Sequence, residues 1–160
     1  MPGTKHLAVS GSRHPLTLPQ RVAADRLMKE AVLEEGFTHL HMGDCVGGDL
    51  YLTQVWAQYK TATSSVIVHP PSGFTLRANW PHYLSIRPPM PYLRRNQMMV
   101  HDSEALIAAP GQMTESVRSG TWSTIRYARQ KGIPILIILP NGHIRYEAKN
   151  EVTHTHSPYR

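Results

Sequence analysis

The stretch Leu7-Ala8-Val9-Ser10-Gly11-Ser12-Arg13 joins a short apolar run to a turn that contains glycine. Uninterrupted apolar runs of this length are typical of buried strands, and a glycine directly after such a run indicates a tight turn. The same arrangement recurs in residues 37–49, where an apolar run leads into Gly43, Gly47 and Gly48. These stretches predict buried strands that each end in a glycine-rich loop.

Segments with helical spacing separate the strand candidates. In residues 19–35 the apolar side chains fall on one face, Pro19 suits the first turn, and Gly36 follows the last turn. We expect further helices over residues 50–59, 92–101 and 119–130, and further strands over residues 65–69, 105–109 and 133–139. Strands that are apolar throughout and alternate with helices are the mark of an α/β protein. The sequence therefore predicts a Rossmann-like three-layer sandwich with a mostly parallel central sheet.

The composition fits one folded domain. The chain has 160 residues, of which 41% are hydrophobic and 18% charged, and this composition is not that of a disordered protein. We expect a single nucleotide-ligand-binding domain over residues 1–142 and a polar C-terminal tail over residues 143–160. Residues 72–91 are rich in proline and show no period, so we expect a long ordered loop of the kind that closes over a site.

Charge and cysteine content narrow the function classes. Cys45 is the only cysteine, which excludes an internal disulfide. The N-terminal segment does not resemble a signal peptide, and the longest apolar run is too short for a membrane helix. We therefore predict a cytoplasmic protein without a membrane partner. The net charge of +6 favours anionic partners, although the cations are spread along the chain.

Glycine-bearing loops meet at one edge of the predicted sheet. Ligands of open parallel sheets bind beyond the carboxyl ends of the strands. Residues 11–13, 43–49 and 108–121 follow three of the predicted strands, and each of these loops contains glycine. Glycine lets backbone amides approach an anion closely, and a following helix adds its positive N-terminal end. We predict a phosphate site here, although neither a Walker loop nor a GxGxxG motif is present.

Four segments together carry a family resemblance. They are Ala8-Val9-Ser10-Gly11-Ser12-Arg13, Met42-Gly43-Asp44-Cys45-Val46-Gly47-Gly48-Asp49, Arg95-Asn96-Gln97-Met98-Met99-Val100 and Ser119-Gly120-Thr121-Trp122. In this order, over residues 7–139, they resemble the SLOG superfamily of Rossmann-like proteins. That superfamily includes the Lonely Guy phosphoribohydrolases, the DNA-processing protein of natural transformation, and small stand-alone modules. The sequence looks most like the small stand-alone branch.

The resemblance implies a ligand site for a nucleotide or nucleotide-sugar phosphate. It implies that the following residues face that ligand: Gly11, Ser12, Arg13, Gly47, Gly48, Arg95, Asn96, Ser119, Gly120 and Thr121. The chemistry of their neighbours adds Gly43, Asp44, Asp49 and Trp122, because an acid can accept a ribose hydroxyl and an indole can stack on a base. Arg13 or Arg95 could clamp the phosphate bidentately. For Asn96, a hydrogen bond that holds the fold is an equally good interpretation.

The sequence favours binding over catalysis. Phosphoribohydrolases of the superfamily have a Pro-Gly-Gly-x-Gly-Thr-x-x-Glu pattern whose glutamate serves cleavage of the base. Here Gly120-Thr121 is followed by Trp122-Ser123-Thr124-Ile125, which contains no carboxylate. We therefore predict sensing or sequestering of a phosphate-bearing nucleotide derivative. Turnover as a nucleotide N-glycosidase or transferase is the alternative. Its catalytic residues are unknown, Glu115 and Asp44 are the candidates, and Asp49, Asp102 and Glu104 are further acids near strand ends. Single-stranded nucleic-acid binding is a second alternative.

The histidines and the cysteine are the residues that could indicate a metal site. His39, His41 and Cys45 lie close in sequence, and His154 and His156 follow in the tail, but none shows the spacing of a known metal motif. We predict neither a metal nor a cofactor. The expected partners are a nucleotide-type small molecule and a second copy of the chain, and nucleic acid is not expected. The subunit contact would lie on the helix that carries Met98 and Met99.

Overall fold

The structure, a computed structural model, describes residues 3–73 and 76–148. Within these ranges the chain forms a seven-stranded sheet in the order β4-β3-β2-β1-β5-β6-β7. The strands are β1 (His6–Gly11), β2 (His39–Met42), β3 (Ser65–Val68), β4 (Ser85–Ile86), β5 (Ala105–Ala109), β6 (Ile135–Ile138) and β7 (Ile144–Glu147). Each neighbouring pair is parallel except β6 and β7, which are antiparallel.

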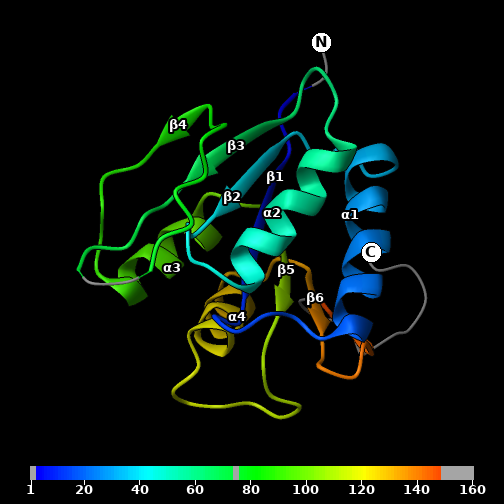
Figure 1. Ribbon diagram of the computed structural model, residues 1–160, viewed down its shortest axis with the longest axis vertical. Coiled ribbons are helices and arrows are strands. Elements are labelled where there is room, and N and C mark those ends of the chain that lie inside the picture. The colour runs from blue at the N-terminus through cyan, green and yellow to red at the C-terminus, as the bar shows by residue number, and fades with distance from the viewer. Residues whose placement is uncertain (1–2, 74–75, 149–160) are drawn as a thin grey trace.

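Helices cover both faces of the sheet (Figure 1). They are α1 (Leu18–Leu33), α2 (Gly48–Tyr59), α3 (Tyr92–His101) and α4 (Gly120–Lys131). One apolar core lies under α1 and α2, and a second lies under α4. This arrangement confirms the predicted Rossmann-like α/β sandwich with a mostly parallel sheet. No helix in the described part of the chain is long and apolar enough to cross a membrane.

The start of α1 ties the carboxyl ends of distant strands together. Thr17 caps the helix in a capping box with Gln20, whose side chain then donates to the carbonyl oxygens of Pro110 and Ile138 at 2.8 and 3.0 Å. Because Gln20 is buried, these two hydrogen bonds also satisfy its amide group. The loop between β1 and α1 is therefore fixed next to the ends of β5 and β6.

The polar tail predicted over residues 143–160 begins too early in the chain, because part of it forms a strand. Ile144–Glu147 forms β7 and pairs with β6, and Tyr146 is buried against the core. Asn141 and Gly142, where φ is 87°, make the turn between the two strands, and the alternation of apolar and polar residues after it suits an edge strand. The polar content of this segment conceals the strand in the sequence. Residues 149–160 lie outside the described residues.

The proline-rich segment is attached to the loop after β2. The Asp44 carbonyl accepts the Ala78 amide at 2.8 Å, and its carboxylate accepts the Trp80 amide at 3.0 Å. The short strand β4 then adds to the sheet edge beside β3. The described residues between 72 and 90 do not line the cavity at the carboxyl edge of the sheet, so the expected closure of this segment over that cavity is not seen.

Candidate functional site

A cavity of about 460 Å³ opens at the carboxyl edge of the sheet, between the loop after β1 and the start of α4. The two segments are far apart in sequence, and the pairing of β1 with β5 brings them together. We call this space the anion cavity, and its lining residues are Gly11, Ser12, Arg13, His14, Tyr92, Gly111, Gln112, Arg118, Ser119, Gly120 and Thr121. A volume of this size suits a small-molecule ligand.

The first turn of α4 supplies backbone donors to the anion cavity. Ser119 is the N-cap, and its hydroxyl accepts the amide of Trp122 at 3.2 Å. The amides of Gly120 and Thr121 have no acceptor among the described residues. Free amides at the positive end of a helix attract an anion. The helix start predicted as part of a phosphate site therefore has the donors that such a site needs.

Two arginines add positive charge beside the helix start. Arg13 and Arg118 both line the anion cavity, and both are exposed. The Arg13 guanidinium lies 4.8 Å from the centre of the Tyr92 ring, and its Nε donates to the Tyr92 hydroxyl at 3.3 Å. This hydrogen bond raises the pKa of Arg13 further above its ordinary value, and the guanidinium is charged at neutral pH. The described lining contains no carboxylate to offset these charges.

A second cavity of about 350 Å³ adjoins the first. The two share Tyr92, Arg118, Ser119 and Gly120. The rest of the second lining includes the side chains of Leu93, Val117, Ser123, Arg126, Tyr127 and Gln130. Its apolar and aromatic members offer a surface for a flat, less polar part of a ligand.

Three predicted ligand-binding glycines allow two loops to touch. A Cβ on Gly48 would lie 2.6 Å from the Cα of Gly11, and a Cβ on Gly47 would overlap the carbonyl oxygen of Arg13. The Gly48 amide also donates to the Ser12 carbonyl oxygen at 2.6 Å. Of the three glycines, only Gly11 lines the anion cavity. Gly47 and Gly48 instead support the loop that carries Arg13.

Arg95 and Asn96 brace the fold outside the anion cavity. Arg95 is 3% exposed and donates to the carbonyl oxygens of Gly43 and His69, and its Nε donates to the Asn96 Oδ1 at 2.8 Å. A Cβ on Gly43 would meet the Arg95 guanidinium at 2.8 Å, so this glycine makes room for it. Both side chains border a gap of only about 10 Å³. The Asn96 Nδ2 donates to the Gly120 carbonyl oxygen at 3.5 Å. This contact is of the kind expected if Asn96 holds the fold rather than the ligand.

Asp44 and Asp49 are buried and already bonded within the protein. Asp44 forms an ion pair with Arg77 at 2.8 Å. Asp49 accepts the Gly11 amide at 2.8 Å, and its burial raises the pKa of this carboxyl to about 6, an effect that the positive charge of Arg95 partly offsets. Neither acid lines the anion cavity, so the structure places no ribose acceptor there from this pair.

Trp122 and Glu115 also lie away from the anion cavity. Trp122 has no exposed surface and belongs to the core under α4, so its ring has no free face for a base. Glu115 forms ion pairs with Arg129 at 2.6 Å and Arg126 at 3.5 Å, and the hydrogen bond from Arg129 lowers its pKa. A carboxylate held in this way is a poor general base, because its proton affinity is reduced.

The ligand set predicted from the sequence does not include Tyr92, Arg118, His14, Gly111 and Gln112, which line the anion cavity. Tyr92 stands at the start of α3, and Arg118 directly precedes the Ser119 cap. Because Arg118 directly precedes Ser119-Gly120-Thr121, its position in the sequence could have predicted that it lies at the cavity. The sequence indicates Tyr92 only as an aromatic that could stack on a base, with Trp122 preferred, because the packing of α3 beside α4 decides where it lies.

Away from the anion cavity, one group of side chains has the chemistry of a metal site. His41, His69 and Asp102 offer ligand atoms that all lie within 4.8 Å of one another. The sequence grouped His41 with His39 and Cys45 instead. Cys45 is buried near Gly43 and Arg95, and it does not belong to this group.

Comparisons with known proteins identify the fold. No protein-family model matches the sequence, and no curated protein matches it significantly. Among solved structures, the molybdenum cofactor binding protein from the phototrophic bacterium Rippkaea orientalis matches with a TM-score of 0.64 and 20% identity, over 86% of this chain and 77% of that chain. The structural-genomics target TM1055 matches with a TM-score of 0.59 and 15% identity, over 82% and 72%.

A third similar structure is DNA processing protein A from Helicobacter pylori, described for its binding of single-stranded DNA. It matches with a TM-score of 0.57 and 18% identity, over 83% of this chain and 64% of that chain. At these identities the likeness concerns the fold. The three structures share the Rossmann-like fold observed here, which is the fold that the resemblance seen in the sequence implies.

Proposed function

We propose that this chain, which has a SLOG-type Rossmann-like fold, binds a phosphate-bearing nucleotide derivative in the anion cavity. The observation that carries this proposal is the pairing of free amides at Gly120 and Thr121 with the cations Arg13 and Arg118 around one cavity. Backbone donors at a helix start together with arginine suit a phosphate dianion better than a neutral ligand. The function would be to sense or sequester that ligand.

The adjoining cavity supports a ligand larger than phosphate alone. Its apolar residues Leu93, Val117 and Tyr127 lie next to the shared Arg118 and Tyr92. A sugar and base attached to the phosphate would extend from the charged cavity into this less polar one. The two cavities together therefore favour a nucleotide derivative over inorganic phosphate.

Binding without turnover is the second part of the proposal. Cleavage of an N-glycosidic bond generally uses a carboxylate to stabilise the oxocarbenium ion or to activate water. The described lining of both cavities contains no aspartate or glutamate. Glu115 and Asp44, the two catalytic candidates named from the sequence, form ion pairs with arginines, and neither lines either cavity.

The structural neighbours add a second candidate ligand and one competing function. One neighbour binds the molybdenum cofactor, and a cofactor with an anionic end would meet the same amides and arginines. Another neighbour is described for single-stranded DNA binding, and this chain has a net charge of +6. The concave, separate anion cavity favours a small molecule over an extended strand.

The decisive experiment identifies the ligand and then tests the arginines. Native mass spectrometry of the freshly purified chain, followed by heat release, identifies any small molecule that co-purifies. Calorimetry then measures the affinity for ADP-ribose, nucleoside monophosphates, molybdenum cofactor and a single-stranded oligonucleotide. We expect Arg13→Ala and Arg118→Ala to weaken binding of the phosphate-bearing ligand about tenfold or more each. Arg94→Ala, an exposed arginine on α3 outside both cavities, is the matched control.

Each outcome separates the alternatives. Equal loss of affinity in the Arg94 control would mean that only net charge matters, as for nucleic-acid binding. If chromatography detects free base released from a nucleoside monophosphate, and Glu115→Ala abolishes this release, the protein is an enzyme and the proposal of binding without turnover is wrong.

A further inference from the structure

Two buried histidines lie on the face of the sheet that α3 covers. Leu40 and Met42 point into the core under α1 and α2, so His41 between them points to the opposite face. His69 directly follows β3, the neighbour of β2. His41 has no exposed surface and His69 is 3% exposed. Two imidazoles at such depth are costly to bury unless their nitrogens have partners.

The two rings are linked to each other and to a third histidine. His41 Nδ1 and His69 Nε2 are 2.8 Å apart, and His41 Nε2 lies 2.7 Å from His6 Nδ1. The other ring nitrogen of His6 reaches the Thr4 hydroxyl at 3.2 Å. When His41 carries its proton on Nε2, it donates to His6, and its Nδ1 lone pair then faces His69.

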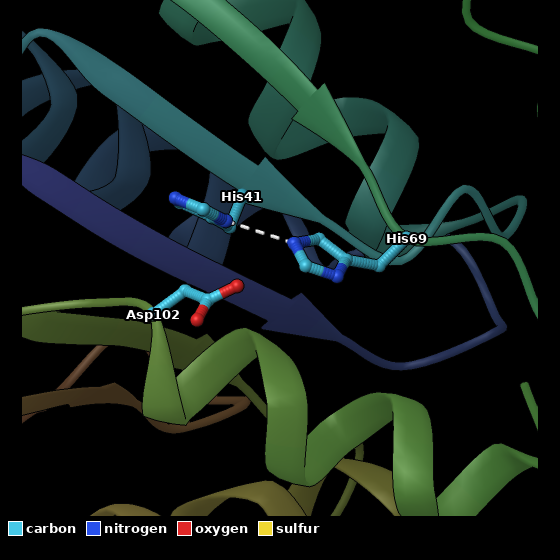
Figure 2. A group of neighbouring side chains, drawn as sticks. All are labelled: His41, His69 and Asp102. Carbon is cyan, nitrogen blue, oxygen red and sulfur yellow. Dashed lines mark hydrogen bonds between the residues drawn. The ribbon is translucent and has the colours of Figure 1, made fainter. Parts of the chain in front are cut away.

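A carboxylate from α3 completes the group. Asp102 follows the last residue of α3, and Figure 2 shows its carboxylate turned toward the His41 and His69 rings. Its Oδ2 is buried and accepts no hydrogen bond from any residue that the structure describes. The Arg87 guanidinium lies 3.6 Å from this oxygen and is 42% exposed, so it is a loose partner that can move away. A buried carboxylate oxygen without a hydrogen bond is a place where a cation is stabilising.

We propose that His41, His69 and Asp102 bind a divalent first-row transition-metal ion of the zinc type. Two imidazole nitrogens and one carboxylate oxygen are ligands that such ions accept. Nitrogens about 2.0–2.1 Å from one tetrahedral ion lie roughly 3.3 Å apart. His41 Nδ1 and His69 Nε2 are 2.8 Å apart, so the two rings would move slightly apart and rotate to face the ion. His69 would then carry its proton on Nδ1, which frees the Nε2 lone pair for the ion.

The surroundings of the three ligands suit this assignment. A histidine that binds a metal typically donates its other N–H to a fixed acceptor, and His6 is placed to accept from His41. None of the three ligands lines the anion cavity, so the metal would be separate from the proposed phosphate site. Asp102 and Arg87 form the partly exposed edge through which an ion would enter. The ligand spacing, 41, 69 and 102, matches no short motif, which explains why the sequence predicted no metal.

Cobalt titration of the full chain tests the site. Because His154 and His156 could bind metal on their own, the reference protein carries His154→Asn and His156→Asn and is first treated with a chelator. We expect one Co²⁺ per chain with micromolar or tighter affinity, visible d–d absorption bands, and shifted ¹⁵N resonances of the His41 and His69 rings. Zn²⁺ should displace Co²⁺ and raise the thermal midpoint, because it binds only the folded chain.

Four variants decide whether these residues are the ligands. Asp102→Asn should weaken Co²⁺ binding roughly tenfold or more, and His69→Gln should remove the absorption bands. Arg87→Gln should strengthen binding, because it removes a competing cation. His143→Asn, an exposed histidine elsewhere, should change nothing.

Two results would overturn the proposed metal site. Absence of stoichiometric binding in the reference protein overturns the proposal. So does unchanged affinity in Asp102→Asn, whose partly exposed position makes it the variant best suited to stay folded, with circular dichroism as the check. If His69→Gln does not fold, the Asp102 and Arg87 variants and the ¹⁵N shifts decide the matter without it.

Discussion

Gly11 at the end of β1 packs against Gly48 at the start of α2 so closely that a Cβ on Gly48 would lie 2.6 Å from the Gly11 Cα. The same Cβ would lie 2.9 Å from the Ser12 amide nitrogen. Both obstacles are backbone atoms, which cannot turn aside as a flexible side chain can. This contact sets the position of the loop that carries Arg13 into the anion cavity.

Gly48→Ala should therefore destabilise the protein by about 1–3 kcal/mol or more, as overpacked substitutions do. Urea unfolding at neutral pH measures the free energy of unfolding. Gly111→Ala is the matched control, because its Cβ would meet only the Ser12 side chain, with the Oγ at 3.1 Å and the Cβ at 3.5 Å. Its effect should stay below about 1 kcal/mol. Equal losses in the two variants would refute the backbone contact as the cause.

The glycine at position 120 makes room for Tyr92. A Cβ there would lie 2.7 Å from the Tyr92 Cε1, so Gly120→Ala must displace the Tyr92 ring. The Arg13 guanidinium packs on this ring and would move with it. We expect a loss of about 1–3 kcal/mol in stability together with weaker ligand binding. In a Tyr92→Ala background the same substitution should cost much less stability. A double-mutant cycle measures this coupling, and additive effects would show that the ring is not the obstacle.

The buried carboxyl of Asp49 predicts a pH effect. Burial raises its pKa to about 6 from an ordinary 3.8, so the folded chain binds more protons than the unfolded chain between these values. The contribution of Asp49 to stability is therefore present at about pH 4 and is lost as the pH rises through 6. The full loss is on the order of 3 kcal/mol.

Asp49→Asn isolates this effect, because asparagine still accepts the Gly11 amide and does not titrate. Relative to this variant, the wild-type chain should lose stability between pH 4 and pH 7. Urea unfolding at four or five pH values measures the difference, in which the titration of all other groups cancels to first order. A difference that stays flat, or rises with pH, would contradict the prediction.

Trp122 is placed to stabilise the fold and has no exposed surface to bind a base. Its whole ring is worth about 3–5 kcal/mol as a buried aromatic side chain, so Trp122→Phe should lose a smaller part of that. The affinity of the folded variant for ADP-ribose should equal that of the wild-type chain. Calorimetry checks this, and a specific loss of affinity without a loss of stability would restore the stacking role inferred from the sequence.

Self-association of the chain remains a prediction, but we now expect the subunit contact at a different place from the helix that carries Met98 and Met99. Met99 is 2% exposed and packs inside the protein, so it does not offer the expected subunit surface. Leu84 and Ile86 are exposed apolar side chains next to and in β4, with exposed fractions of 64% and 45%. We expect a homodimer that uses these residues, and Leu84→Lys should shift it toward monomer in light scattering. A monomer mass at high concentration would contradict this expectation.

The sequence by itself determined the fold class and the edge of the sheet where the cavity lies. Strands covered by helices on both faces must be apolar throughout, so residues 7–9, 105–109 and 135–138 are visible as uninterrupted apolar runs. Loops that approach an anion or another backbone need glycine, so Gly11 and Gly120 mark the strand and helix ends beside the cavity. These are local requirements, and local requirements leave a pattern in the chain.

Only the tertiary structure decided which polar residues meet. The glycines at 47 and 48 look like ligand contacts in the sequence, yet they support a neighbouring loop, because close backbone packing demands the same residue as close approach to a phosphate. Tyr92 at the anion cavity and the group of His41, His69 and Asp102 depend on the strand order and on where α3 packs. Such contacts join residues far apart along the chain, and their spacing in the sequence therefore carries no periodic signal.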